Sequence, residues 1–122
     1  MRDQELFITY LEEEKKKCIE REQHLIKDER KDEATVCKIE SNIYDIFCAL
    51  YQAAVREAEK NDRDDVMVDE IFLSKAKVVP ENWKKSLVAA KKHDDITKIL
   101  IEEAKLQVAE KIVEEYRRQM EN

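Results

Sequence analysis

The side chains best suited to chemistry in this sequence are lysines gathered in one short stretch. Positions 75 to 92 hold six lysines and one acid, Glu81, in a chain whose total formal charge is -6. An indole beside ammonium groups could stack on a nucleic-acid base while the lysines contact phosphates. The same surface could dock on an acidic protein. This candidate interaction surface consists of Lys75, Lys77, Trp83, Lys84, Lys85, Lys91 and Lys92.

A structural explanation competes with the functional one for this basic stretch. Trp83 could anchor a short helix in the core while the lysines around it are solvated. The stretch contains no arginine, the residue usually preferred for bidentate phosphate contacts. The negative total charge also opposes general affinity for nucleic acid or anionic membrane. Nucleic acid is therefore the less favoured partner.

Four aspartates form an acidic cluster that resembles a loose site for a hard cation. An EF-hand loop needs a central glycine and a glutamate at its twelfth position. Counted from Asp62, the corresponding positions hold Met67 and Leu73, so this comparison fails. We predict that the cluster supplies helix caps and solvated loop charges. Its members are Asp62, Asp64, Asp65 and Asp69.

The two histidines offer little for a metal site. His24 has Glu20 and Asp28 four residues away on either side, a spacing that could form part of a zinc shell. The ExxH motif of di-iron bundles does not occur in the sequence. His93 lies near the expected end of a helix, where its charged form would interact favourably with the helix dipole. We predict no metal and no cofactor.

The three cysteines form an odd set without CxxC spacing, which indicates reduced thiols in a cytoplasmic protein. In an antiparallel hairpin that turns near Asp32, Cys18 would approach Cys48. A redox pair is one interpretation of that approach. We favour Cys18, Cys37 and Cys48 as small buried apolar residues instead.

The chain contains no glycine at all, and this excludes several catalytic loops. A P-loop, a dinucleotide-binding GxGxxG turn and a GxSxG nucleophile elbow all need glycine. No nucleophile and base stand at a recognisable spacing, so we predict no enzyme activity. A bundle that binds or transforms a small ligand remains an alternative, with Tyr44, Asp45, Tyr51 and Glu103 as its candidate residues.

Apolar residues recur at helical spacing along the whole chain, which predicts an all-α antiparallel bundle forming one domain over residues 1–122. We expect Asp3, Asp32 and Asp94 as N-caps. Val79 should leave the α region before Pro80, the first residue of the next helix. The expected helices are three long ones at about 3–31, 33–60 and 95–121, with two short ones at about 65–78 and 80–92.

The sequence leaves two features of the topology open. The short helices could lie end to end and complete a four-helix bundle, or they could fold back as a hairpin. A break at His93-Asp94 is favoured, although one continuous helix beyond Pro80 is the alternative.

Charged residues interrupt the apolar stripe of the first helix between Leu11 and Cys18. If that stripe faces the core, Glu14 and Arg21 could pair beside it. A thinly packed helix of this kind is typical of dimerising or partner-binding proteins. No apolar run approaches the roughly 18 residues of a membrane-spanning helix. We therefore predict a small cytoplasmic interaction module whose partner is a second copy or an unidentified protein, without membrane association.

Overall fold

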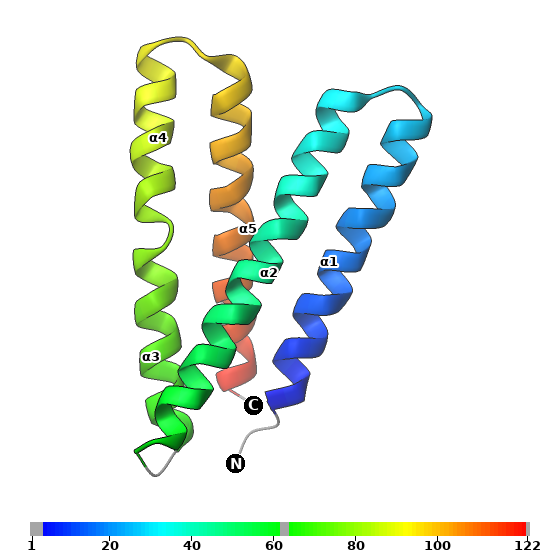
Figure 1. The fold of residues 1–122 in the computed structure, drawn as a ribbon. Coiled ribbons are helices and arrows are strands. Elements are labelled where there is room, and N and C mark those ends of the chain that lie inside the picture. Colours follow the sequence, from blue (N-terminus) through cyan, green and yellow to red (C-terminus); the bar gives the residue numbers. More distant parts are fainter. Residues whose placement is uncertain (1–3, 62–63, 122) are drawn as a thin grey trace.

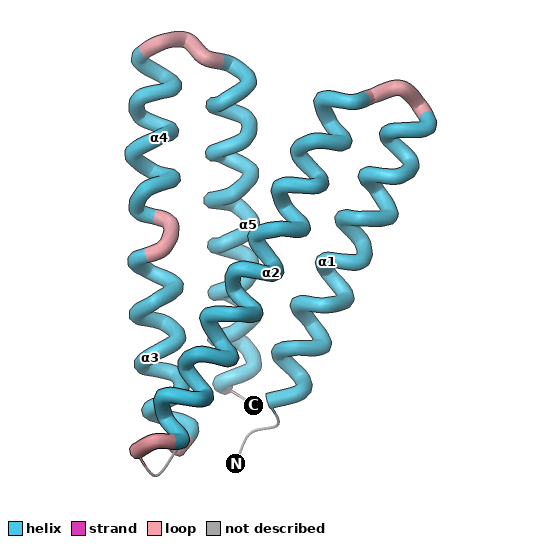
Figure 2. Tube along the Cα trace, viewed as in Figure 1, coloured by secondary structure: helices cyan, strands magenta, loops and turns pink. Residues whose placement is uncertain are grey.

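The computed structural model describes residues 4–61 and 64–121. Helices make up nearly all of this part of the chain, and it contains no strand (Figure 2). The prediction of an all-α bundle is therefore confirmed. The helices are α1 (Gln4–Lys27), α2 (Lys31–Glu59), α3 (Asp65–Val78), α4 (Glu81–Lys92) and α5 (Ile96–Met120).

The two short helices, α3 and α4, lie end to end and form one rod (Figure 1). We expected Val79 to leave the α region before the proline, and this was wrong: Val79 has φ -55° and ψ -43°. Its N–H still donates to the Lys75 carbonyl, and the Lys84 N–H donates to the Pro80 carbonyl, both at 3.0 Å. Pro80 itself is the N-cap residue rather than the first residue of α4. Because both residues stay near helical geometry, the rod bends little at the joint.

The described residues form four rods, namely α1, α2, the α3–α4 rod and α5. These rods meet at one end of the molecule and separate into two arms at the other (Figure 1). Helix α2 packs along α1 and also contacts α3 and α5, whereas α4 packs on α5. One arm is the upper part of the α1–α2 hairpin. The other, named here the α4–α5 arm, comprises residues 81–106.

An aromatic cluster joins all four rods at the end where α1 begins and α5 ends. The Phe7 ring of α1 lies 4.8 Å from the Tyr116 ring of α5 and 5.0 Å from the Tyr51 ring of α2, between centroids. Phe72 of α3 completes the group, 4.4 Å from Tyr116. Most of these rings meet edge to face, the arrangement that the ring quadrupoles favour.

The corner between α1 and α2 closes without glycine. Glu29 takes the left-handed conformation, with φ 60°, and the Arg30 N–H donates to the Leu25 carbonyl at 2.8 Å. This is the six-residue hydrogen bond of a Schellman motif, whose left-handed position glycine usually fills. The turn therefore comes earlier than predicted. The first helix ends at Lys27, and the expected N-cap Asp32 lies inside the first turn of α2.

The corner between α4 and α5 repeats the same motif. Asp94 has φ 51°, and the Asp95 N–H donates to the Ala90 carbonyl at 3.0 Å. The predicted break at this point is confirmed. The N-cap, however, is Asp95 rather than Asp94, since the Asp95 carboxylate accepts a hydrogen bond from the Lys98 N–H at 3.2 Å. Asp3, the predicted cap of the first helix, lies outside the described residues.

Replacing the ring at the centre of the aromatic cluster should cost more stability than any surface change. Phe72 is 0% exposed, and we expect Phe72→Ala to lower the free energy of unfolding by about 3–5 kcal/mol. Urea denaturation followed by circular dichroism measures this change. Val66→Ala on the same helix is the matched control, because Val66 is 64% exposed. A loss from Phe72→Ala no larger than that from the control would contradict the central role of the ring.

The two corners should each become more stable when glycine replaces the left-handed residue. We expect Glu29→Gly and Asp94→Gly to raise the free energy of unfolding by about 0.5–1 kcal/mol, because glycine adopts positive φ without a steric penalty. Thermal denaturation measures the gain. Lys92→Gly, inside the last turn of α4, should instead lose about 1 kcal/mol. If both glycine variants are less stable than the native chain, Glu29 and Asp94 adopt positive φ without the expected steric penalty.

Candidate functional site

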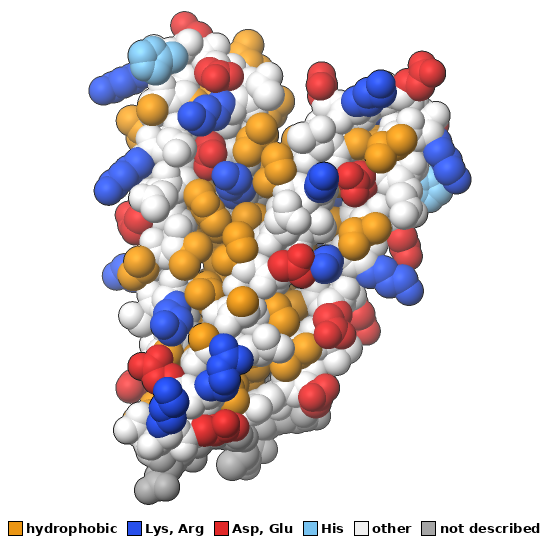
Figure 3. Space-filling view, in the orientation of Figure 1, with side chains coloured by type: hydrophobic (Ala, Val, Ile, Leu, Met, Phe, Trp, Pro, Cys, Tyr) orange, Lys and Arg blue, Asp and Glu red, His pale blue; other side chains and the backbone are white. Residues whose placement is uncertain are grey.

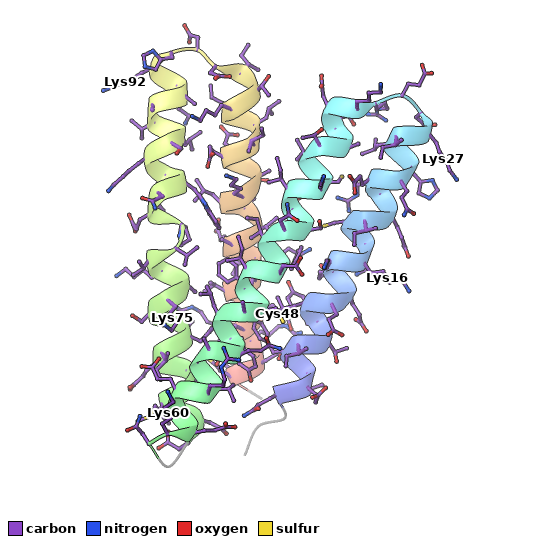
Figure 4. The ribbon with its side chains drawn as sticks, viewed as in Figure 1. Lys16, Lys27, Cys48, Lys60, Lys75 and Lys92 are labelled. Atoms are coloured by element: carbon purple, nitrogen blue, oxygen red, sulfur yellow. The ribbon has the colours of Figure 1, made fainter. Side chains whose placement is uncertain are left out.

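The lysines of the predicted basic surface lie on more than one face of the α3–α4 rod. Residues seven positions apart share a helix face, so Lys77, Lys84 and Lys91 form one row, named here the lysine row. Lys85 and Lys92 lie on the neighbouring face. The remaining lysine, at position 75, is half-buried and lies far along the rod from position 92 (Figure 4).

Trp83 lies apart from the exposed lysines. Its ring is half-buried and packs against the hydrophobic core. Lys105 of α5 places its Nζ 5.8 Å from the ring centroid, within the range of a cation–π contact. Trp83 therefore packs the rod against α5, in line with the structural explanation of this residue.

A groove of about 740 Å³ runs between the α3–α4 rod and α5. Two members of the lysine row, Lys77 and Lys84, line it. Helix α5 contributes acids and one further cation, which the sequence reasoning did not single out. The signal for them is a heptad spacing: Glu110 and Arg117 share one face of α5 with Glu103, which lies beyond the groove lining. The whole lining is Leu73, Ser74, Ala76, Lys77, Pro80, Lys84, Leu106, Ala109, Glu110, Val113, Glu114 and Arg117.

Exposed apolar side chains lie beyond the groove on the α4–α5 arm. Val88 is 57% exposed, Leu100 is 56% exposed and Ile96 is 72% exposed. Ile96 lies fourteen residues, close to four helical turns, before Glu110 and shares its face of α5. Leu100 points about 80° away from Glu110, and Val88 lies one turn beyond Lys84 on the rod. The groove, Val88 and Ile96 therefore lie along one side of the rod pair, named here the groove face. On another face, hydrophobic side chains gather where the two arms diverge (Figure 3).

A second, polar pocket of about 290 Å³ lies beside α1, α2 and α5. Its central group is Glu14, a buried carboxylate that accepts from Lys111 Nζ at 2.5 Å and lies 2.8 Å from Lys17 Nζ. Burial raises the pKa of Glu14, but hydrogen bonds from Lys111 and Lys17 outweigh that effect and hold it below its ordinary value. The first helix therefore turns Glu14 inward, and Glu14 forms its ion pairs with Lys17 and Lys111 rather than with Arg21.

The residues proposed for a ligand-binding or catalytic bundle lie in different surroundings. Tyr44 lines the Glu14 pocket, where burial raises the pKa of its hydroxyl. Tyr51 belongs to the aromatic cluster, whereas Asp45 is exposed and forms an ion pair with Lys15 at 2.8 Å. Glu103 is half-buried on the α4–α5 arm. The four side chains are not assembled into one site.

The cysteines are free thiols, with Cys18 and Cys37 buried. Burial is the main cause that raises the pKa of each thiol, including Cys48. The predicted approach of Cys18 to Cys48 was wrong. Because the chain turns at 28–30 rather than near Asp32, Cys18 faces an earlier part of α2 and has Cys37 among its electrostatic neighbours.

The acidic cluster acts partly as predicted. Asp64 caps α3 by accepting from the Met67 N–H at 2.7 Å. Asp69 is buried instead of solvated, and it accepts a hydrogen bond from the Tyr116 hydroxyl at 2.5 Å. Asp62 lies outside the described residues.

The described ranges 4–61 and 64–121 contain neither a metal-ligand cluster nor a membrane-spanning helix. No group of three or more His, Cys, Asp or Glu side chains there is arranged to hold a metal ion. Both histidines, at positions 24 and 93, are exposed. No helix in these ranges combines the length and apolar character needed to cross a bilayer.

Comparison of this chain with protein-family models, with curated proteins and with solved structures found no match.

Removing the charge of Glu14 should produce a pH-dependent loss of stability. A carboxylate whose pKa is lowered by folding stabilises the protein above its unfolded pKa, about 4.3, and less as the pH falls through its folded pKa. We expect Glu14→Gln to cost about 1–3 kcal/mol at neutral pH, and this cost should shrink below pH 4. Urea denaturation at a series of pH values measures it. A cost that stays equal at pH 7 and pH 3 would contradict the inferred ionisation.

Proposed function

We propose that this protein is an interaction module that binds a second copy of itself through the groove face. The observation that carries the proposal is the continuity of the apolar groove floor with exposed Val88 and Ile96. Contiguous exposed apolar surface rimmed by polar groups is typical of protein–protein interfaces.

The packing of α4 supports this proposal. Within α4, all of which the structure describes, Ala90 is the one buried residue. The helix packs on α5 and diverges from the α1–α2 arm (Figure 1). A helix with so little of its surface covered gains stability when a second molecule covers more of it.

The size of the groove face also suits a dimer. Two helices about 10 Å wide and about 30 Å long present roughly 600 Å² of projected surface. Stable interfaces bury about 800 Å² per partner, which is the same order once side-chain relief is included. The acids Glu110 and Glu114 on the rim favour a protein surface over a phosphate backbone.

Nucleic-acid binding has less support from the contacts of the same residues. Trp83 is half-buried beneath Lys105 instead of standing among the lysines as a stacking platform. The lysines point to more than one face of the rod, so they do not form a single strip for a backbone. We further propose a cytoplasmic location, because free thiols are kept reduced there.

Placing charge on the exposed apolar part of the groove face should abolish self-association. Sedimentation velocity over a range of concentrations should show a dimer for the native chain and a monomer for the variant Val88→Glu/Ile96→Glu. The helices should tolerate both changes, since both positions are more than half exposed.

The matched control is Leu6→Glu/Ile26→Glu, in which two similarly exposed apolar residues of α1, outside the groove face, are changed. This control should remain dimeric. A native chain that stays monomeric up to millimolar concentration would overturn the proposed self-association. A control that dissociates as readily as the variant would show that another surface is responsible.

A further inference from the structure

We propose that the two copies are related by a two-fold axis parallel to the helices, so that the α3–α4 rod of each copy lies over α5 of the other. This inference rests on the proposed self-association and specifies its geometry. In such a dimer each copy uses the same surface, and the assembly closes at two copies.

The contact between Trp83 and Lys105 places these two residues at about the same height along the helix axes, called here their level. The levels of the other residues are counted from this pair. The two rods are antiparallel, so a step forward on one corresponds to a step back on the other. Counted from that contact, Lys84 lies one residue from the level of Glu103. Lys77 lies equally close to the level of Glu110.

Rotation about a two-fold axis parallel to the helices leaves every residue at its level. It places the α3–α4 rod of one copy opposite α5 of the other. Lys84 of one copy then faces Glu103 of the second copy, and Lys77 faces Glu110. Both contacts occur twice by symmetry. The lysine row of each copy is thus placed over the acidic face of α5 in the other.

One further level of the groove face follows the same rule. Glu70 stands seven residues before Lys77 on the rod, near the level of Arg117 on α5. The arrangement therefore pairs charges of opposite sign at three levels.

A two-fold axis across the helices gives a worse match. It would place each rod over the rod of the second copy and α5 over α5. The lysine row would then face another lysine row, and Glu103 and Glu110 would face other acids. Like charges placed opposite each other oppose association and select against a wrong alignment.

The charged pairs are expected to set the alignment, while the apolar side chains supply most of the affinity. Exposed ion pairs contribute little individually because water and salt screen them. A reversal of charge, however, turns each attraction into a repulsion, and symmetry doubles every change.

Charge reversal on the two rods tests this alignment directly. The acidic variant is Lys77→Glu/Lys84→Glu, and the basic variant is Glu103→Lys/Glu110→Lys. Each alone should dimerise roughly 100-fold more weakly than the native chain, because four contacts between copies become repulsive. An equimolar mixture of the two variants should restore a dimer with one copy of each, observed by sedimentation velocity and native mass spectrometry.

The matched control is Lys85→Glu/Lys92→Glu, which reverses two lysines with the same spacing on the neighbouring face of the rod. It should dimerise like the native chain. Circular dichroism and urea denaturation should show that every variant keeps the native helix content and a cooperative unfolding transition.

The outcomes separate this inference from the proposed function. If the native chain dimerises but the mixed variants do not associate, the parallel axis is wrong while self-association stands. If the acidic variant dimerises as tightly as the native chain, the lysine row does not face acids and the inference also fails. A monomeric native chain would overturn both proposals.

Discussion

The aromatic cluster is the contact that holds the four rods together. Phe7, Tyr51, Phe72 and Tyr116 come from four different rods, and their ring centroids lie between 4.4 and 5.9 Å apart. Because large rings lie at one end of the molecule, the rods are drawn together there (Figure 1). Smaller and more polar side chains occupy the other end, so the bundle divides into two arms.

The division into arms determines what surface the molecule presents. The α4–α5 arm has α5 as the main support of α4, and it leaves Val88, Ile96 and Leu100 in contact with solvent. The lysine row and the acids of α5 lie on either side of the adjoining groove, so the face carries charges of both signs. A face of this kind is suited to meet its own copy, because a rotation can place each sign over its opposite.

Apolar spacing predicted the helices, whereas Pro80 and the capping Asp94 predicted the breaks near Pro80 and His93, since these features depend on local preferences. The end-to-end α3–α4 rod could not be predicted, because proline normally moves the preceding residue out of the α region, whereas Val79 remains helical beside a buried Pro80. The groove depends on α5 lying against that rod, so its acids were missed. Cys18 was paired with the wrong cysteine because the corner was placed about three residues too late.

The positions of the aromatic residues along the chain also determine when the bundle can complete its folding during synthesis. The α1–α2 and α4–α5 hairpins join helices that are neighbours in sequence, and such local contacts form quickly. The Phe7 and Tyr116 rings, by contrast, lie 4.8 Å apart although they come from opposite ends of the described chain. A nascent chain on the ribosome can therefore form its first hairpin early, but its aromatic cluster is complete only after Tyr116 has left the exit tunnel.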